Sequence, residues 1–116
     1  MLRQVFAFRN SLAGLKFGVM REPALREEVF FIVLSVPLAP MLTRDPWTLV
    51  ALWGSLLLLL SIELLNTGIE KLADRVTRED DDLIKAAKDC GSAAVLIAIL
   101  LATMVWGVAL WERFFA

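Results

Sequence analysis

Apolar residues fall into four segments along the chain, and the first segment has a helical period. Between residues 2 and 20, apolar side chains recur every three or four positions, at Val5, Phe8, Leu12, Leu15 and Val19. Arg3, Arg9 and Lys16 lie off this face, which is the pattern of an amphipathic helix. Because basic amphipathic helices bind to anionic bilayer surfaces, we predict a surface helix at about residues 2–21. The alternative is a solvated helix of an ordinary bundle.

The other three segments are continuous apolar runs. They hold 14, 17 and 22 uncharged residues, at Val29–Leu42, Pro46–Ile62 and Cys90–Trp111. A helix needs about 20 apolar residues to cross a bilayer, so the first run is long enough only with the charged turn 24–28 at the interface. We therefore predict three transmembrane helices, at about residues 26–42, 46–66 and 88–111.

Capping and turn residues separate these segments. Pro37 and Pro40 are expected to end or kink the first span. Asp45 can cap the next helix, with Pro46 in its first position. The acidic block 79–82 lacks the glycine and the ligand spacing of a calcium-binding EF-hand. We therefore interpret it as a solvated turn that caps the third span.

Composition supports a membrane protein and restricts the chemistry. The chain has 116 residues, enough for a single domain over 1–116, and 59% of them are hydrophobic, above the usual 45–50% or so. Histidine is absent and Cys90 is the only cysteine, so a bound metal would be a hard, oxygen-ligated ion such as Mg²⁺. The net charge of −1 does not by itself argue for or against nucleic acid, and no nucleic-acid partner is predicted.

The cations are distributed unevenly between the segments that flank the spans. Ten of the 12 lysines and arginines precede the first span or lie between the second and third, and only Arg44 and Arg113 lie elsewhere. Because positive residues stay in the cytoplasm, this bias puts the N-terminus and residues 63–89 on the cytoplasmic side. Three spans then leave the C-terminus outside.

A polar stripe continues the second apolar run and is the most unusual feature of the sequence. At 100° per residue, one helix face carries Glu63, Asn66, Thr67, Glu70 and Asp74. Polar groups that begin inside a span are costly and usually mark a site. Further polar residues are predicted at the same depth, namely Glu22, Glu28, Lys88, Asp89 and Ser92.

These groups suit a magnesium-bound polyphosphate, with carboxylates for the metal and lysine for phosphate oxygens. Glu63, the deepest acid, is a candidate general base, and a purely structural role is an equally good interpretation. No glycine-rich phosphate loop is present. The residues alone do not identify the reaction.

Two motifs identify a family. Glu63-x-x-Asn66-Thr67-x-Ile69-Glu70 followed by Asp74-Arg75, and then Lys88-Asp89-x-Gly91-Ser92-Ala93-Ala94-Val95, resemble the signature of the prokaryotic diacylglycerol kinase family. Asn10-Ser11-x-x-Gly14 and Glu22-x-x-x-Arg26-x-Glu28 match as well. The resemblance implies an all-α, homotrimeric enzyme of the bacterial inner membrane, with active sites shared between protomers. It would transfer the γ-phosphoryl group of MgATP to diacylglycerol, giving phosphatidic acid.

The resemblance also implies a role for each motif residue. Glu63 would be the general base, and Glu22 and Glu70 would hold Mg²⁺. The nucleotide would be bound by Glu22 and Glu70 together with Arg3, Ser11, Asn66, Glu79, Asp81, Lys88 and Asp89. The lipid would lie near Glu28, Glu63 and Ser92, with Ser11 and Ser92 beside the transferred phosphoryl group or the lipid head group.

Three positions depart from the family pattern, and other functions remain open. Phe6 and Ala13 stand where related sequences often have basic residues, and Asp81 stands where well-known members have histidine.

A branch that phosphorylates undecaprenol has similar motifs, although the surface helix and the match after Lys88 favour diacylglycerol. A more remote alternative is a non-enzymatic membrane subunit that uses the stripe as an ion path. In either case a three-span protomer needs neighbours to shield the stripe from lipid.

Overall fold

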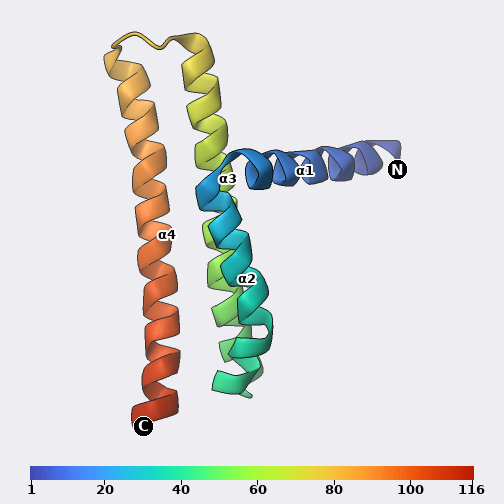
Figure 1. Ribbon diagram of the computed structural model, residues 1–116, viewed down its shortest axis with the longest axis vertical. Helices are drawn as coiled ribbons and strands as arrows, with labels where there is room; N and C mark the ends of the chain where they lie inside the picture. Colours follow the sequence, from blue (N-terminus) through green and yellow to red (C-terminus); the bar gives the residue numbers. More distant parts are fainter.

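The computed structural model describes residues 1–116 as four helices without a β-strand, so the predicted all-α fold is confirmed. The helices are α1 (Leu2–Arg21), α2 (Pro23–Leu42), α3 (Pro46–Val76) and α4 (Asp82–Phe115). α3 and α4 lie side by side and make the most extensive contact, while α2 covers the half of α3 that carries its N-terminus (Figure 1). α1 extends sideways from this bundle, roughly across the direction of the other helices (Figure 1).

The change of direction between α1 and α2 occurs at one residue. Glu22 has an extended backbone (φ −119°, ψ 114°), and Pro23 starts α2 without needing a backbone donor. The guanidinium of Arg26 donates to the carbonyls of Val19 and Met20, each at 3.3 Å, and so satisfies free acceptors at the end of α1. Gly18 is buried inside the joint. This corner directs α1 away from the axis of α2.

The core of the bundle lies where α2, α3 and α4 meet. Ala39, Leu52 and Ala109 form its buried centre. Two tryptophans bond across the helices: the indole N–H of Trp53 donates to Ser35 O at 3.0 Å, and that of Trp106 donates to Leu52 O at 3.1 Å. Inside a bilayer such bonds are valuable, because no water competes for the donors. α2 continues through Pro37 and Pro40 and ends at Leu42, shortly after Pro40.

α3 continues through the polar stripe, as predicted. It begins with the expected cap, in which Asp45 accepts a hydrogen bond from Thr48 N at 2.9 Å, and it ends at Val76. A short turn at 77–81 leads into α4, where the Asp81 carboxylate accepts from the N–H groups of Leu83 and Ile84. The prediction that the acidic block caps a helix is therefore confirmed.

Two helices are long and apolar enough to cross a membrane. They are α3 and α4, whose most apolar windows have mean hydropathies of 2.1 and 2.5. α2 does not meet this criterion, because its 20 residues include Arg26, Glu27 and Glu28. Its crossing therefore stays a prediction. Only 13 of the 116 residues are buried, so most apolar side chains need lipid or another chain to cover them.

Candidate functional site

Residues in the polar stripe of α3, or next to it, approach each of the other three helices. Asn66, Glu70 and Asp74 lie on the side of α4, while Glu63 lies near enough to Glu27 and Glu28 of α2 for their charges to interact. On the side of α1, Lys71 forms an ion pair with Glu22, with Nζ and Oε1 2.9 Å apart. Residues of the stripe or next to it thus lie close to Glu22, Glu28 and Lys88 of the sequence motifs.

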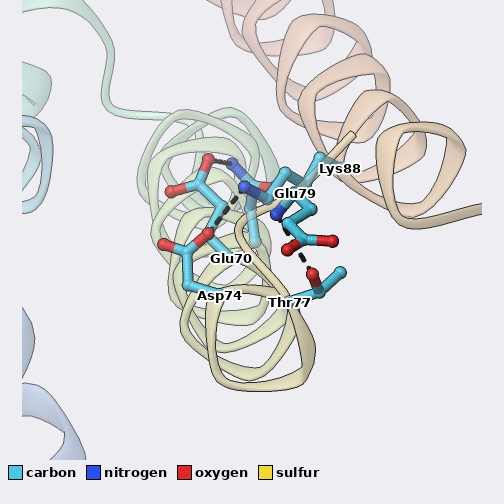
Figure 2. Close-up of polar contacts among 6 residues, drawn as sticks. Glu70, Asp74, Thr77, Glu79 and Lys88 are labelled. Carbon is cyan, nitrogen blue, oxygen red and sulfur yellow. Dashed lines mark hydrogen bonds and ion pairs between the residues drawn. The ribbon is translucent and has the colours of Figure 1, made fainter. Parts of the chain in front are cut away.

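Between α3 and α4 the polar side chains form a cluster that we call the crest, defined by Asn66, Glu70, Asp74 and Lys88. Figure 2 shows Glu70, Asp74 and Lys88 converging from the two helices. Asn66 Nδ2 donates to Glu70 Oε1 at 3.3 Å, and Lys88 Nζ lies 2.6 Å from Asp74 Oδ1. The hydrogen bond from Lys88 holds the pKa of Asp74 below its ordinary value, so this carboxylate stays ionised at neutral pH.

A charged pocket of about 530 Å³ lies beyond the crest, at the turn between α3 and α4. This volume falls within the range of small-molecule sites, roughly 300–1,000 Å³. Its lining includes four residues that the sequence assigned to the nucleotide, namely Glu79, Asp81, Lys88 and Asp89. Three of them have structural contacts within the chain: Lys88 pairs with Asp74, Asp81 caps α4 through Oδ1, and Asp89 pairs with Lys85 at 2.6 Å. The pocket therefore joins the acidic turn to the crest.

A second groove, of about 600 Å³, separates α1 from α3. Small residues line it on both sides, among them Ser11, Gly14 and Gly18 of α1 and Thr67 and Gly68 of α3. The structure thus brings Ser11 near the stripe, while Arg3 lies in the exposed first turn of α1. The N-terminal end of this helix lies far from the bundle (Figure 1). Ser92 is exposed one residue after the buried Gly91.

The two carboxylates predicted to hold a metal have different partners within one chain. Glu22 pairs with Lys71 on the α1 side, whereas Glu70 is held by Asn66 on the α4 side. No group of three or more acidic, cysteine or histidine side chains could hold an ion by itself. Mg²⁺ in phosphoryl-transfer sites commonly uses only one or two carboxylates and completes its shell with phosphate oxygens and water. The residues therefore fit a magnesium ion that enters with a nucleotide.

Two buried oxygens of the site have no hydrogen-bond partner. They are Oε1 of Glu28, whose residue is only 8% exposed, and Oδ1 of Asn66. Buried polar atoms are nearly always paired, so each exception needs an explanation. One explanation is a ligand or a second molecule that completes the site. Asn66 Oδ1 occupies the space that a side chain at Gly91 would fill. Gly91 belongs to the second sequence motif but was not predicted to have a role, although a glycine inside a helix is a signal of close approach.

Comparison with known proteins gives one consistent result. The sequence model described as prokaryotic diacylglycerol kinase matches residues 9–110. A diacylglycerol kinase of Escherichia coli K12 is 41% identical over 112 residues, which cover 97% of this chain and 92% of that protein. Diacylglycerol kinases of Haemophilus influenzae and Pseudomonas aeruginosa are each 38% identical, over 85% and 86% of this chain and 84% and 81% of their own.

Proposed function

The chain belongs to the prokaryotic diacylglycerol kinase family, and on this premise we propose that it transfers the γ-phosphoryl group of MgATP to the hydroxyl of diacylglycerol, producing phosphatidic acid. The observation that carries this proposal is the identity of 41% across nearly the whole chain. The polar stripe begins where an apolar run ends. Such a position suits a reaction between a membrane alcohol and a water-soluble nucleotide.

In this mechanism the depth of each carboxylate decides its role. Glu63, at the apolar end of the stripe, would accept the proton from the lipid hydroxyl. The hydroxyl oxygen then forms its bond to the γ-phosphorus while the bond to the β–γ bridging oxygen breaks, and ADP leaves. Lys88, at the crest, would neutralise charge on the phosphate oxygens. Glu28 and Ser92 would line the part of the site that binds the lipid. The lipid head group would then give the unpaired Oε1 of Glu28 a hydrogen-bond partner.

The nucleotide would occupy the pocket and the crest. Glu79, Asp81 and Asp89 line the pocket with Lys88, while Asn66, Ser11 and Arg3 would contribute from the stripe and the surface helix. Glu22 and Glu70 would hold the magnesium ion, which, when bound, supplies charge neutralisation at the β- and γ-phosphates. Since Asp81 already caps α4 through one oxygen, only its other oxygen is free for the nucleotide.

We further propose that the enzyme is a homotrimer with active sites shared between protomers. Within one chain Glu22 and Glu70 have different partners, so a neighbour's surface helix could supply the second carboxylate. Few residues are buried within one chain, and the stripe is partly exposed. Because lipid cannot satisfy its polar atoms, a neighbouring protomer is expected to cover them. Family resemblance alone gives the number of protomers.

We also propose a multi-pass protein of the bacterial inner membrane, with its N-terminus and residues 63–89 in the cytoplasm and its C-terminus outside. The orientation follows from the uneven distribution of cations. The sideways direction of α1 supports a helix that lies in the plane of the membrane surface (Figure 1).

A two-lipid assay tests the proposed reaction. Membranes that contain the protein would receive labelled ATP with diacylglycerol, undecaprenol or both. We expect labelled phosphatidic acid to be the dominant product, and membranes without the protein serve as the control. Turnover of undecaprenol alone would mean that undecaprenol, and not diacylglycerol, is the lipid substrate. No turnover of either lipid would favour a non-enzymatic membrane subunit.

A further inference from the structure

The orientation of the Asn66 amide is fixed by its two neighbours. Its Nδ2 donates to Glu70 Oε1 at 3.3 Å, and because a carboxylate can only accept, the amide nitrogen must face Glu70. Oδ1 therefore points the other way. There it is buried, without a hydrogen-bond partner, against the backbone of α4 at Gly91. The amide thus stands between the carboxylate of Glu70 and the neighbouring helix.

Position 91 requires glycine because there is no room for a Cβ, and not because of an unusual backbone conformation. It is buried within α4, and no glycine of the chain has a positive φ. A Cβ at this position would overlap Asn66 Oδ1 and come within 3.2 Å of Asn66 Cγ. By contrast, a Cβ at Gly107, on the same helix, would meet nothing within 4 Å. Since alanine favours a helix more than glycine does, the glycine at 91 needs a packing explanation.

We propose that Gly91 is a positioning residue for metal binding: it leaves the space in which the Asn66 amide stands, and the amide in turn orients the Glu70 carboxylate. This inference rests on the proposed function, in which Glu70 holds the metal. Outer-shell partners of this kind fix the direction of a ligand's lone pairs, and their loss typically weakens metal binding or activity by about 10–100-fold. Gly91 itself touches neither metal nor substrate.

A substitution by alanine should act through Asn66. The new methyl group displaces Oδ1, so the amide rotates or withdraws and its hydrogen bond to Glu70 is lost. Ile69 Cδ1 lies 3.6 Å from the added Cβ, an ordinary contact that requires no movement. Gly91→Ala should therefore disturb the crest at Asn66 without a general loss of contact between α3 and α4.

The test measures metal binding directly and does not depend on turnover. The full-length protein in detergent micelles, with a non-hydrolysable ATP analogue, would be titrated with Mn²⁺, and free Mn²⁺ would be followed by electron paramagnetic resonance. We expect the Kd for Mn²⁺ to rise about 10–100-fold in Gly91→Ala and in Asn66→Ala, and to rise in Glu70→Gln. Gly107→Ala should stay within about twofold of the wild type. An unchanged Kd in Gly91→Ala or in Glu70→Gln would overturn the inference.

The double variant Gly91→Ala with Asn66→Ala separates positioning from general packing. If Gly91 acts through Asn66, the double variant should match Asn66→Ala within about twofold, and effects that multiply would overturn the inference. Should Gly91→Ala alone fail to fold, the double variant should fold, since the clashing amide is gone; failure of both would overturn the inference. The two-lipid assay on the wild type tests the kinase reaction separately, so metal binding without lipid turnover would reject only the proposed reaction.

Discussion

The ammonium of Lys88 lies 2.6 Å from a carboxylate oxygen of Asp74, and this ion pair joins α4 to α3 across the crest. Both side chains are more than a third exposed, at 39% and 38%, so water screens the pair and its contribution to stability is small. Its effect is to hold the ammonium beside Glu70 and at the edge of the charged pocket (Figure 2). The pair therefore orients this ammonium at the pocket more than it stabilises the fold.

Removal of the Asp74 charge should reduce stability only where the carboxylate is ionised. The hydrogen bond from Lys88, followed by nearby cations, lowers the pKa of Asp74. A lowered native pKa stabilises the fold fully above the unfolded pKa of about 3.9, and this contribution is lost as the pH falls through the native value. We expect Asp74→Asn to have a slightly lower Tm than the wild type at pH 7, and the difference to shrink as the pH falls below about 4 and to vanish below the lowered native pKa. Circular dichroism in a non-ionic detergent measures it; a difference that persists at low pH would contradict the assignment.

Replacement of Glu63 by glutamine tests its role as the base. Because the amide cannot accept the hydroxyl proton, kcat should fall by about 100- to 10,000-fold while the binding of MgATP is retained. Glu27→Gln is the matched control, since Glu27 is a nearby but exposed glutamate of α2, and it should keep turnover close to that of the wild type. Steady-state assays with diacylglycerol measure both variants. Full turnover in Glu63→Gln would leave Glu63 with a structural role.

Local features of the fold could be predicted from the sequence because they depend on neighbours in the chain. Asp45 and the acidic block 79–82 were expected to cap helices, and the carboxylates of Asp45 and Asp81 accept from backbone N–H groups within three residues. The continuation of α3 through the polar stripe followed from the helical spacing of Glu63, Glu70 and Asp74. All of these depend on the geometry of a single helix.

The contacts between helices could not be predicted in the same way. The pairing of Lys88 with Asp74, and of Lys71 with Glu22, depends on how far one helix slides along another, and one sequence does not encode this in any local pattern. For the same reason the space between Gly91 and Asn66 was missed. The sequence indicated candidate residues for the site, and the structure adds which of them are neighbours.

Substitutions of Asp81 should show whether its main role is to cap α4 or to bind the nucleotide. Its Oδ1 accepts from Leu83 N at 2.9 Å and from Ile84 N at 3.0 Å. Asparagine caps about as well as aspartate, so Asp81→Asn should keep the wild-type Tm, whereas Asp81→Ala should lose about 1 kcal/mol. Asp80→Ala controls for the loss of a negative charge in the same turn. A raised KM for ATP in Asp81→Asn, with stability unchanged, would indicate contact with the nucleotide.

Gly18 and Gly14 provide a matched pair on α1. A Cβ at Gly18 would lie 2.6 Å from Leu25 Cδ1 and 3.2 Å from Leu64 Cδ2, whereas one at Gly14 would meet nothing within 4 Å. Overpacking of this kind costs about 1–3 kcal/mol, while glycine to alanine in an open helix position gains about 0.5–1 kcal/mol. Gly18→Ala should therefore lower the Tm and Gly14→Ala should raise it. Equal shifts in both variants would mean that α1 does not pack at Gly18 as described.

The two tryptophan bonds between helices should contribute measurably to stability. Trp53 donates to Ser35 O and Trp106 donates to Leu52 O, so each indole joins two helices through a backbone carbonyl within the apolar core. Phenylalanine keeps an aromatic ring but has no donor, and interhelical hydrogen bonds in membrane proteins contribute about 0.6 kcal/mol on average and up to about 1.7 kcal/mol. Trp53→Phe and Trp106→Phe should each lower the free energy of unfolding by an amount in this range, measured by denaturation in mixed micelles. Trp47→Phe is the control, because Trp47 is 79% exposed at the start of α3, and its replacement should have a smaller effect. Equal losses in all three variants would show that ring size, and not the hydrogen bond, is what matters.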